Sequence, residues 1–187
     1  MGYTLLAMHD SWATIPNERV SFERERGVSA IKVSREATYM LVRVLDPSHL
    51  PAQRQRILHL LREAEIPIFL IKLQRNGLSF GVDSELAARA CAILEANGFR
   101  VAVKPSRVMV SIFAQNMREL HGVIARIAEV LYEAGVAIEQ LSDAHNRITC
   151  LIEAERAPLV VERLCEAFGL SRQTLQKPPV ALVSEAP

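Results

Sequence analysis

The sequence is short of the residues that mark most catalytic and nucleic-acid-binding proteins. Aromatic residues make up only 5% of the 187 residues and form no cluster that could stack on bases. Neither sign of charge prevails, because 22 basic residues face 21 acidic ones and leave a formal net charge of +1. Nucleic-acid binding needs a concentrated basic surface. We therefore expect no nucleic-acid partner.

Cysteine and histidine are also sparse, and their spacing indicates no site. The three cysteines, Cys91, Cys150 and Cys165, have no short spacing between them, and each falls within an apolar pattern. We interpret them as reduced core residues, which are typical of a cytoplasmic protein. The five histidines show no metal-ligand spacing with one another or with the cysteines. The sequence predicts no metal site.

Several further motifs are missing. No apolar run is long enough to span a membrane, and the N-terminus has neither the basic flank nor the apolar stretch of a signal peptide. No glycine-rich phosphate loop and no nucleophile elbow is present. We expect a cytoplasmic protein with no catalytic residue, no cofactor and no membrane contact.

What the chain does have is an apolar core and an internal repeat. Half of its residues are hydrophobic, which is enough to bury a sizeable core. The segment LLREAEIPIFLI (60–71) aligns with VLYEAGVAIEQL (130–141) at an offset of 70 residues, which also places Ala52 over Gly122. A repeat of this length suits two copies of a small domain.

Each copy has the hydrophobic periodicity of a βαββαβ unit. In the first copy we predict strands at 38–45, 66–73, 78–82 and 99–104, and helices at 57–64 and 84–97. In the second we predict strands at 107–114, 136–141 and 147–153, a helix at 122–134, and a helix that begins near Pro158 and ends at Gly169. The fold class is therefore α+β, with two ferredoxin-like units whose helices cover one face of an antiparallel sheet. The second copy lacks a final strand, and residues 27–34 are the candidate for that place.

Two loops between a first strand and a first helix are the candidate binding elements. They read DPSHLPA (46–52) and QNMRELHG (115–122). A helix N-terminus exposes unpaired N–H groups and a partial positive charge, which suit a carboxylate. Gly122 would let a ligand approach the backbone closely. The same glycine is equally consistent with a tight turn that binds nothing.

The repeat and these segments resemble a known family. The stretch HGVIARIAEVLYEAGVAIEQLSDAHNRITCLI (121–152) resembles the second ACT domain of aspartokinase, and GVSAIKVSREATYMLVRVLD (27–46) resembles the lead-in to its first ACT domain. The resemblance covers about residues 27–170. The ATP- and aspartate-binding domain of aspartokinase is not found in these residues, so the chain resembles the separate regulatory subunit, or β chain.

The resemblance implies a domain organisation and a class of ligand. In the family the first ACT domain is inserted in the second, and paired ACT domains bind small effectors, usually amino acids, at their interfaces. The implied division is an N-terminal extension (1–26), ACT domain 1 (36–104), ACT domain 2 (27–35 with 105–170) and a C-terminal tail (171–187). Aspartokinase regulatory regions respond to lysine or threonine and dimerise through side-by-side sheets. A kinase catalytic chain is then an implied partner.

The resemblance also implies a set of effector contacts. By position these are Ser48, His49, Leu50, Pro51, Ala52, Phe69, Leu73 and Gln74 in the first copy, and His121, Gly122, Val123, Ala137, Ile138 and Glu139 in the second. The chain departs from the family pattern at several of them. His49 replaces an acid and Ala52 a glycine in the first loop, and Phe69 stands in a strand where the family has a carboxylate. Ala137 replaces the usual asparagine.

We therefore hypothesise a non-catalytic, homodimeric regulatory protein that binds an amino acid or related small carboxylate at an ACT interface. One alternative is an ACT dimer that has lost its ligand and serves only as a protein-protein interaction module. A second is an enzyme on a ferredoxin-like scaffold, since fold does not fix function. The sequence offers no catalytic residue for the second alternative.

Overall fold

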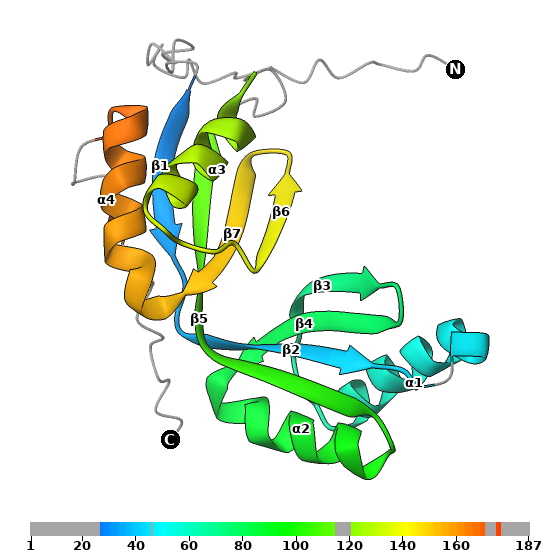
Figure 1. Cartoon of the computed structure of the whole chain (residues 1–187). Coiled ribbons are helices and arrows are strands. Elements are labelled where there is room, and N and C mark those ends of the chain that lie inside the picture. The colour runs from blue at the N-terminus through cyan, green and yellow to red at the C-terminus, as the bar shows by residue number, and fades with distance from the viewer. Residues whose placement is uncertain (1–26, 46, 115–120, 171–174, 177–187) are drawn as a thin grey trace, which may run out of the picture.

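A computed structural model describes residues 27–45, 47–114, 121–170 and 175–176. The predicted N-terminal extension, most of the predicted C-terminal tail and residues 115–120 of the second candidate loop lie outside these residues. The described chain forms two α+β units, which share one long strand (Figure 1).

Unit 1 is the first copy of the repeat and has the strand order β3-β4-β2-β5. Its elements are β2 (Ala37–Arg43), α1 (Leu50–Glu63), β3 (Phe69–Gln74), β4 (Gly77–Asp83), α2 (Ala87–Ala96) and the first half of β5 (Arg100–Ala114). Short 3-10 turns, Pro47–His49 and Ser84–Leu86, precede the two helices. Every strand pair is antiparallel, and both helices lie on one face of the sheet (Figure 1). This is the predicted ferredoxin-like arrangement.

Unit 2 is the second copy, and its sheet uses the other half of β5. Its elements are α3 (Val123–Glu133), β6 (Gln140–Ala144), β7 (Arg147–Glu153), a 3-10 turn (Ala154–Arg156), α4 (Ala157–Phe168), β1 (Val28–Val33) and β8 (Leu175–Gln176). β6 pairs with β7, β7 with β5, and β5 with β1, all antiparallel. β8 then lies parallel to β1 at the edge of the sheet.

β1 supplies the strand that the second copy lacks in sequence. Val33 lies opposite Val110 and Val28 opposite Ala114, so the segment pairs with the second half of β5. Ile31 is buried in the core of unit 2. The predicted pairing of this segment with the second sheet is therefore present.

Several of the predicted element boundaries are wrong, because α1 begins at Leu50 and not near 57, and β3 begins at Phe69 and not at 66. The prediction ended one strand at 104 and began another at 107, whereas β5 is a single strand that bends between the two sheets. Arg107 pairs with Ala37 of β2 and with Glu153 of β7, so both ladders reach the same residue. Pro105 has no N–H and reads as a strand end in the sequence. The strand after α3 was also placed too early, because β6 begins only at Gln140.

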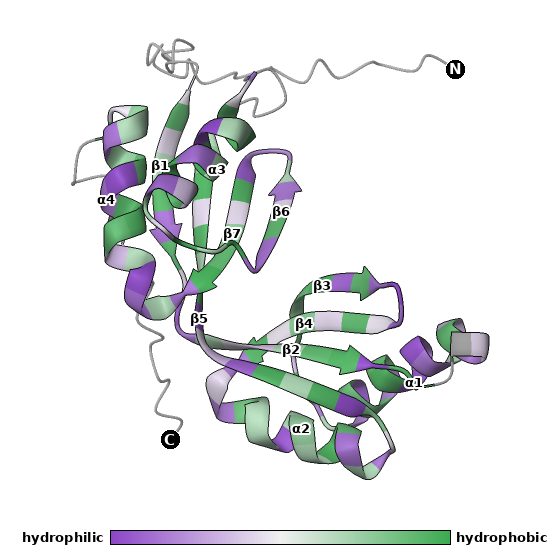
Figure 2. Ribbon diagram, viewed as in Figure 1, coloured by the Kyte–Doolittle hydropathy of each residue, from purple (hydrophilic) through white to green (hydrophobic). Residues whose placement is uncertain are grey.

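Each unit has its own apolar core between sheet and helices. In unit 1 the core includes Met40, Ile57, Leu61, Phe80 and Leu94. In unit 2 it includes Ile112, Ile127, Leu131, Ile148 and Leu164. Hydrophobic residues follow the central strands in both units, while hydrophilic residues recur on the outer helix faces (Figure 2). Each sheet therefore buries one face under helices and leaves the other face for different contacts.

Gly77 occupies a position in unit 1 where no side chain fits. It begins β4 opposite Arg43, and a Cβ atom there would lie 1.9 Å from the carbonyl oxygen of Val42. The obstacle is backbone and cannot move without disturbing the β2–β4 ladder. The β3–β4 turn also depends on this position, because the Arg54 Nε donates to the Gly77 carbonyl over 3.0 Å.

We predict that Gly77→Ala lowers the free energy of unfolding by roughly 1–3 kcal/mol or more, the usual cost of forcing atoms into a packed site. Gly27→Ala is the matched control, because a Cβ at Gly27 would meet no atom within 4 Å. Thermal unfolding followed by circular dichroism would measure both variants. Equal melting temperatures for Gly77→Ala and wild type would show that β4 does not hold this register.

Candidate functional site

The two candidate loops lie at opposite ends of the molecule. β2 leads into α1 beside the start of β5, where Arg43 pairs with Arg100, whereas the loop before α3 follows the end of β5 at Ala114. At about 3.3 Å per residue, the 15 residues of β5 would span roughly 45 Å if straight. Figure 1 shows the starts of α1 and α3 at the two far ends of the bent chain. Within one chain these loops cannot form one pocket.

The first loop is shorter than the sequence indicated. Ser48 and His49 are exposed and lie in the 3-10 turn, but α1 already begins at Leu50, so Pro51 and Ala52 belong to its first turn. Pro51 has no N–H, which removes one of the donors that a helix N-terminus offers to an anion. Ala52 is therefore not the structural equivalent of Gly122, although the repeat aligns the two.

The second loop ends in an open helix N-terminus. Gly122 is the N-cap of α3 and has a φ of +80°, in the left-handed region that favours glycine. Its carbonyl accepts the first helical hydrogen bond, from the N–H of Arg126 over 2.9 Å. Among the described residues, which do not include 115–120, no side chain caps the first turn, and a Cβ at Gly122 would meet nothing within 4 Å. His121 is exposed and Val123 half-buried beside this open space.

The remaining contacts predicted in unit 2 lie at the other end of α3. Ala137, Ile138 and Glu139 follow the C-terminal end of the helix, and its 11 residues are about 16 Å long. The carboxylate and ammonium of an α-amino acid are bonded to the same carbon atom. One such ligand therefore cannot touch both Gly122 and Glu139 of a single chain.

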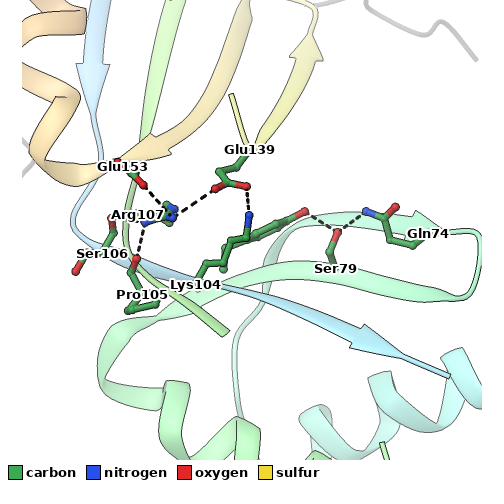
Figure 3. Close-up of polar contacts among 9 residues, drawn as sticks. Gln74, Ser79, Lys104, Pro105, Ser106, Arg107, Glu139 and Glu153 are labelled. Carbon is green, nitrogen blue, oxygen red and sulfur yellow. Dashed lines mark hydrogen bonds and ion pairs between the residues drawn. The ribbon is translucent and has the colours of Figure 1, made fainter. Parts of the chain in front are cut away.

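Glu139 lies where the two units meet. Its Oε2 accepts a hydrogen bond of 2.6 Å from the Lys104 Nζ of unit 1, and its Oε1 lies 3.4 Å from Arg107 (Figure 3). Arg107 also lies 3.4 Å from the Glu153 carboxylate, and its guanidinium donates to the Pro105 carbonyl. The side chains of Glu139 and Arg107 are only 17% and 13% exposed, whereas that of Lys104 is 42% exposed. We call Lys104, Arg107, Glu139 and Glu153 the junction cluster.

The junction cluster keeps Glu139 ionised. Burial alone would raise the pKa of Glu139, but the hydrogen bond and charge of Lys104, together with Arg107, outweigh burial and hold the pKa below its ordinary value. Glu139 is thus a carboxylate that already has two cationic partners. Sequence reasoning selected Glu139 but missed Lys104 and Arg107, which the bend of β5 brings to it.

Gln140 makes a second contact at the same junction. The residue is 6% exposed, and its Nε2 donates to the Leu70 carbonyl of unit 1 over 2.8 Å. Its Oε1 and the Arg107 Nε are buried and have no hydrogen-bond partner among the described residues. Leu70 has a φ of +49° and lies in an irregularity of the β3–β4 ladder between Phe69 and Lys72. The sequence gives no signal for this contact, which depends on how the units sit together.

The contacts predicted in β3 lie on unit 1. Gln74 is half-buried, and its Nε2 and the Tyr39 hydroxyl both donate to the Ser79 Oγ, over 3.0 and 2.7 Å. The ring of Phe69 covers Gly81, whose Cβ would lie 2.3 Å from it. Leu73 is 63% exposed. An aromatic ring therefore occupies the sheet surface at the position where the family resemblance implies a carboxylate.

The cysteines are packing residues to different degrees. Cys150 and Cys165 are buried, and burial raises the pKa of the Cys150 thiol to about 11, which makes it a poor nucleophile. Cys91 is only half-buried, so the prediction of a core position was too strong there. The described residues hold no group of three or more His, Cys, Asp or Glu side chains placed to bind a metal ion. Among their helices none is both long and apolar enough to cross a membrane.

Comparison with known proteins shows what the second unit is similar to. Residues 110–168, which run from β5 through α4, match the family model of the ACT domain. The rest of the described chain repeats the same βαββαβ topology. We therefore refer to both units, by this similarity, as ACT units.

The whole described chain resembles the regulatory region of aspartokinase. A crystal structure of aspartokinase alpha and beta subunits matches with a TM-score of 0.71 and 25% identity, over 76% of this chain and 99% of that one. The ligand-free regulatory subunit of aspartate kinase from Thermus thermophilus shares the fold, with a TM-score of 0.68 and 20% identity over 76% and 98% of the two chains. Aspartokinase from Geobacillus stearothermophilus is 32% identical over 97 residues, which are 51% of this chain. The match spans only 24% of that enzyme.

We predict that Glu139→Gln lowers the free energy of unfolding at neutral pH by roughly 1–3 kcal/mol, because the mostly buried Arg107 loses a charged partner. We expect the decrease in the free energy of unfolding to lie near the lower end of this range, since Lys104 is 42% exposed and water screens its charge. Glu133→Gln, on the exposed surface of α3, is the control. Urea unfolding would measure the difference between the variants.

The pH dependence gives a separate prediction. Because the folded state lowers the pKa of Glu139, its stabilising contribution is complete above the ordinary value of 4.5 and is lost as the pH falls through the lower, folded-state value. The stability difference between wild type and Glu139→Gln should therefore stay constant above pH 4.5 and shrink below it. A difference independent of pH across this window would contradict the assignment.

Proposed function

We propose that this chain is a non-catalytic regulatory protein that binds an amino acid or a related small carboxylate between ACT units of two copies. The supporting observation is the match to a chain in the crystal structure of aspartokinase alpha and beta subunits, which this chain covers over 99% of its length. The regulated partner would be a kinase catalytic chain. We propose the division into ACT units 36–104 and 27–35 with 105–170 on the basis of the shared strand β5.

The geometry of unit 2 supports a ligand carboxylate at the start of α3. The first-turn N–H groups of α3 have no side-chain cap, and Gly122 leaves the approach open. A helix N-terminus of this kind attracts an anion through its unpaired donors and dipole. Since Glu139 lies at the opposite end of α3, a Glu139 that receives the ligand ammonium would be that of a second copy of the chain.

The sheet edges support dimerisation. The described sheet has three edge strands, which are β3, β6 and the two-residue β8. β3 carries two exposed apolar side chains, Ile71 and Leu73, at 49% and 63% exposure. Open edges with apolar side chains favour pairing between copies.

We predict a homodimer in solution, with a mass by light scattering of twice the 20.8 kDa of one chain. Leu73→Lys, which places a charge on the open edge, should shift the protein toward the monomer. Val103→Lys is the control, because Val103 is also exposed but lies on β5, inside the sheet. A wild-type mass of one chain at micromolar concentration would rule out the dimer.

We predict that an amino acid raises the melting temperature, because a ligand that binds only the folded state must stabilise it. Gly122→Asn should abolish that increase, since asparagine tolerates a positive φ but places a side chain in the ligand's path. Valine is unsuitable at this position, because a φ of +80° would strain its backbone. Gly98→Asn is the matched control, with a φ of +82° and equally open space in unit 1.

A melting-temperature screen of the standard amino acids, with lysine and threonine included, would decide whether the protein binds one of them. If Gly98→Asn abolishes the increase in melting temperature as Gly122→Asn does, the increase is not specific to the start of α3. The ligand would then bind elsewhere. No increase with any amino acid would favour the second candidate function, a ligand-free ACT dimer that acts as an interaction module. Two observations favour that candidate: the Phe69 ring over Gly81, and the pairing of Glu139 with Lys104 and Arg107.

A further inference from the structure

The unusual features of the described chain gather where the two units meet. Two of the three non-glycine residues with a positive φ among the described residues lie there, Ser106 at the bend of β5 (+53°) and Leu70 (+49°), while the third, Glu65, follows the end of α1. The buried polar atoms without a hydrogen-bond partner, Arg107 Nε and Gln140 Oε1, belong to the same region. Non-glycine residues in the left-handed region carry a conformational cost and often mark segments that switch. The junction therefore differs from the two well-packed cores on either side of it.

Among the described residues, two side-chain hydrogen bonds join unit 1 to unit 2 at this place. Lys104, which pairs with Tyr39 in the unit 1 ladder, donates to Glu139. Gln140 donates to the carbonyl of Leu70. Both contacts are polar, and Figure 3 shows Lys104 reaching across from the sheet of unit 1 to Glu139 in unit 2. Polar contacts of this kind can be exchanged for others more readily than an apolar core can be separated.

Lys104 presents to Glu139 the same chemical group that an amino acid would bring. Its ammonium lies 2.6 Å from the carboxylate and is 42% exposed, so a ligand ammonium can reach the same oxygen atoms. Arg107 does not depend on Glu139 alone, because Glu153 also lies within 3.4 Å of it. Displacing Lys104 would thus break a contact between units without leaving a buried cation unpaired.

We propose that the Lys104–Glu139 ion pair is an internal latch, which holds the two ACT units at a fixed angle and which the ammonium of a bound amino acid displaces. Lys104 then competes with the ammonium of the ligand for the carboxylate of Glu139. When the ligand takes Glu139, the angle at the bend of β5 is released, and ligand binding is converted into a change in the relative position of the units. This inference rests on the proposed function only for the identity of the displacing group.

The first test measures the angle without any ligand. Nitroxide labels at Arg89→Cys on α2 and Tyr132→Cys on α3 report the distance between units by pulsed electron paramagnetic resonance. Both positions are exposed, Cys91 is replaced by alanine, and the other two cysteines are buried. Labelled chains are diluted with unlabelled wild type, so that distances within one chain dominate in a dimer.

Lys104→Met keeps the aliphatic stem and removes the ammonium. It should broaden or shift the distance distribution, whereas Lys72→Met, at an exposed lysine of β3, should leave it as in wild type. Gln140→Leu should act in the same direction as Lys104→Met, because it removes the contact with Leu70. An unchanged distribution in Lys104→Met, with circular dichroism showing a folded protein, would overturn the latch.

The second test adds the standard amino acids as probes at millimolar concentration. An amino acid that stabilises wild type should bind Lys104→Met about tenfold more tightly, since a charge-assisted contact no longer has to be displaced. The same amino acid should move the wild-type distances toward those of Lys104→Met. Equal affinity for both proteins would overturn the latch but leave the proposed function standing. A broadened distribution in Lys104→Met with no stabilising amino acid would support the latch and contradict amino-acid sensing.

Discussion

The structure depends on one continuous strand that belongs to two sheets. β5 pairs with β2 over its first half and with β1 and β7 over its second half, so both units are built on the same 15 residues. A strand cannot change its register in one sheet without changing its position in the other. The two ACT units are therefore connected by backbone hydrogen bonds as well as by side chains. Any change in their relative position has to be absorbed at the bend beside Pro105 and Ser106.

That constraint explains why the charged residues lie where they do. At the bend the two sheets diverge, and the helices that cover each core do not reach across the gap (Figure 1). Lys104, Arg107 and Glu139 fill this place with ion pairs, in which the guanidinium and the carboxylate are mostly buried. Burying a charged group costs free energy unless the group is paired. Each member of the cluster would therefore be destabilising without its partners, and this cost holds the cluster together.

The two candidate loops differ in local structure although their units share a topology. The first loop ends in a 3-10 turn, and Pro51, in the first turn of α1, has no N–H to donate. The second loop keeps Gly122 in a left-handed conformation at an uncapped helix start. The two units thus share a topology but offer different surfaces, and only the second presents an open anion-binding geometry. The chain shares its fold with the regulatory subunit of aspartate kinase from Thermus thermophilus.

Sequence reasoning was enough to predict the repeat and the βαββαβ order of both units, and it made residues 27–34 the candidate for the missing strand of the second sheet. These predictions depend on hydrophobic periodicity and on glycine and proline positions, which act locally and are visible in the chain. The continuity of β5, the start of α1 at Leu50 and the separation of Gly122 from Glu139 by the length of α3 became known only from the structure. The structure also shows that Lys104 and Arg107 are the partners of Glu139. Such contacts join residues about 30 or more positions apart, and the bend that brings them together has no periodic signal in the sequence.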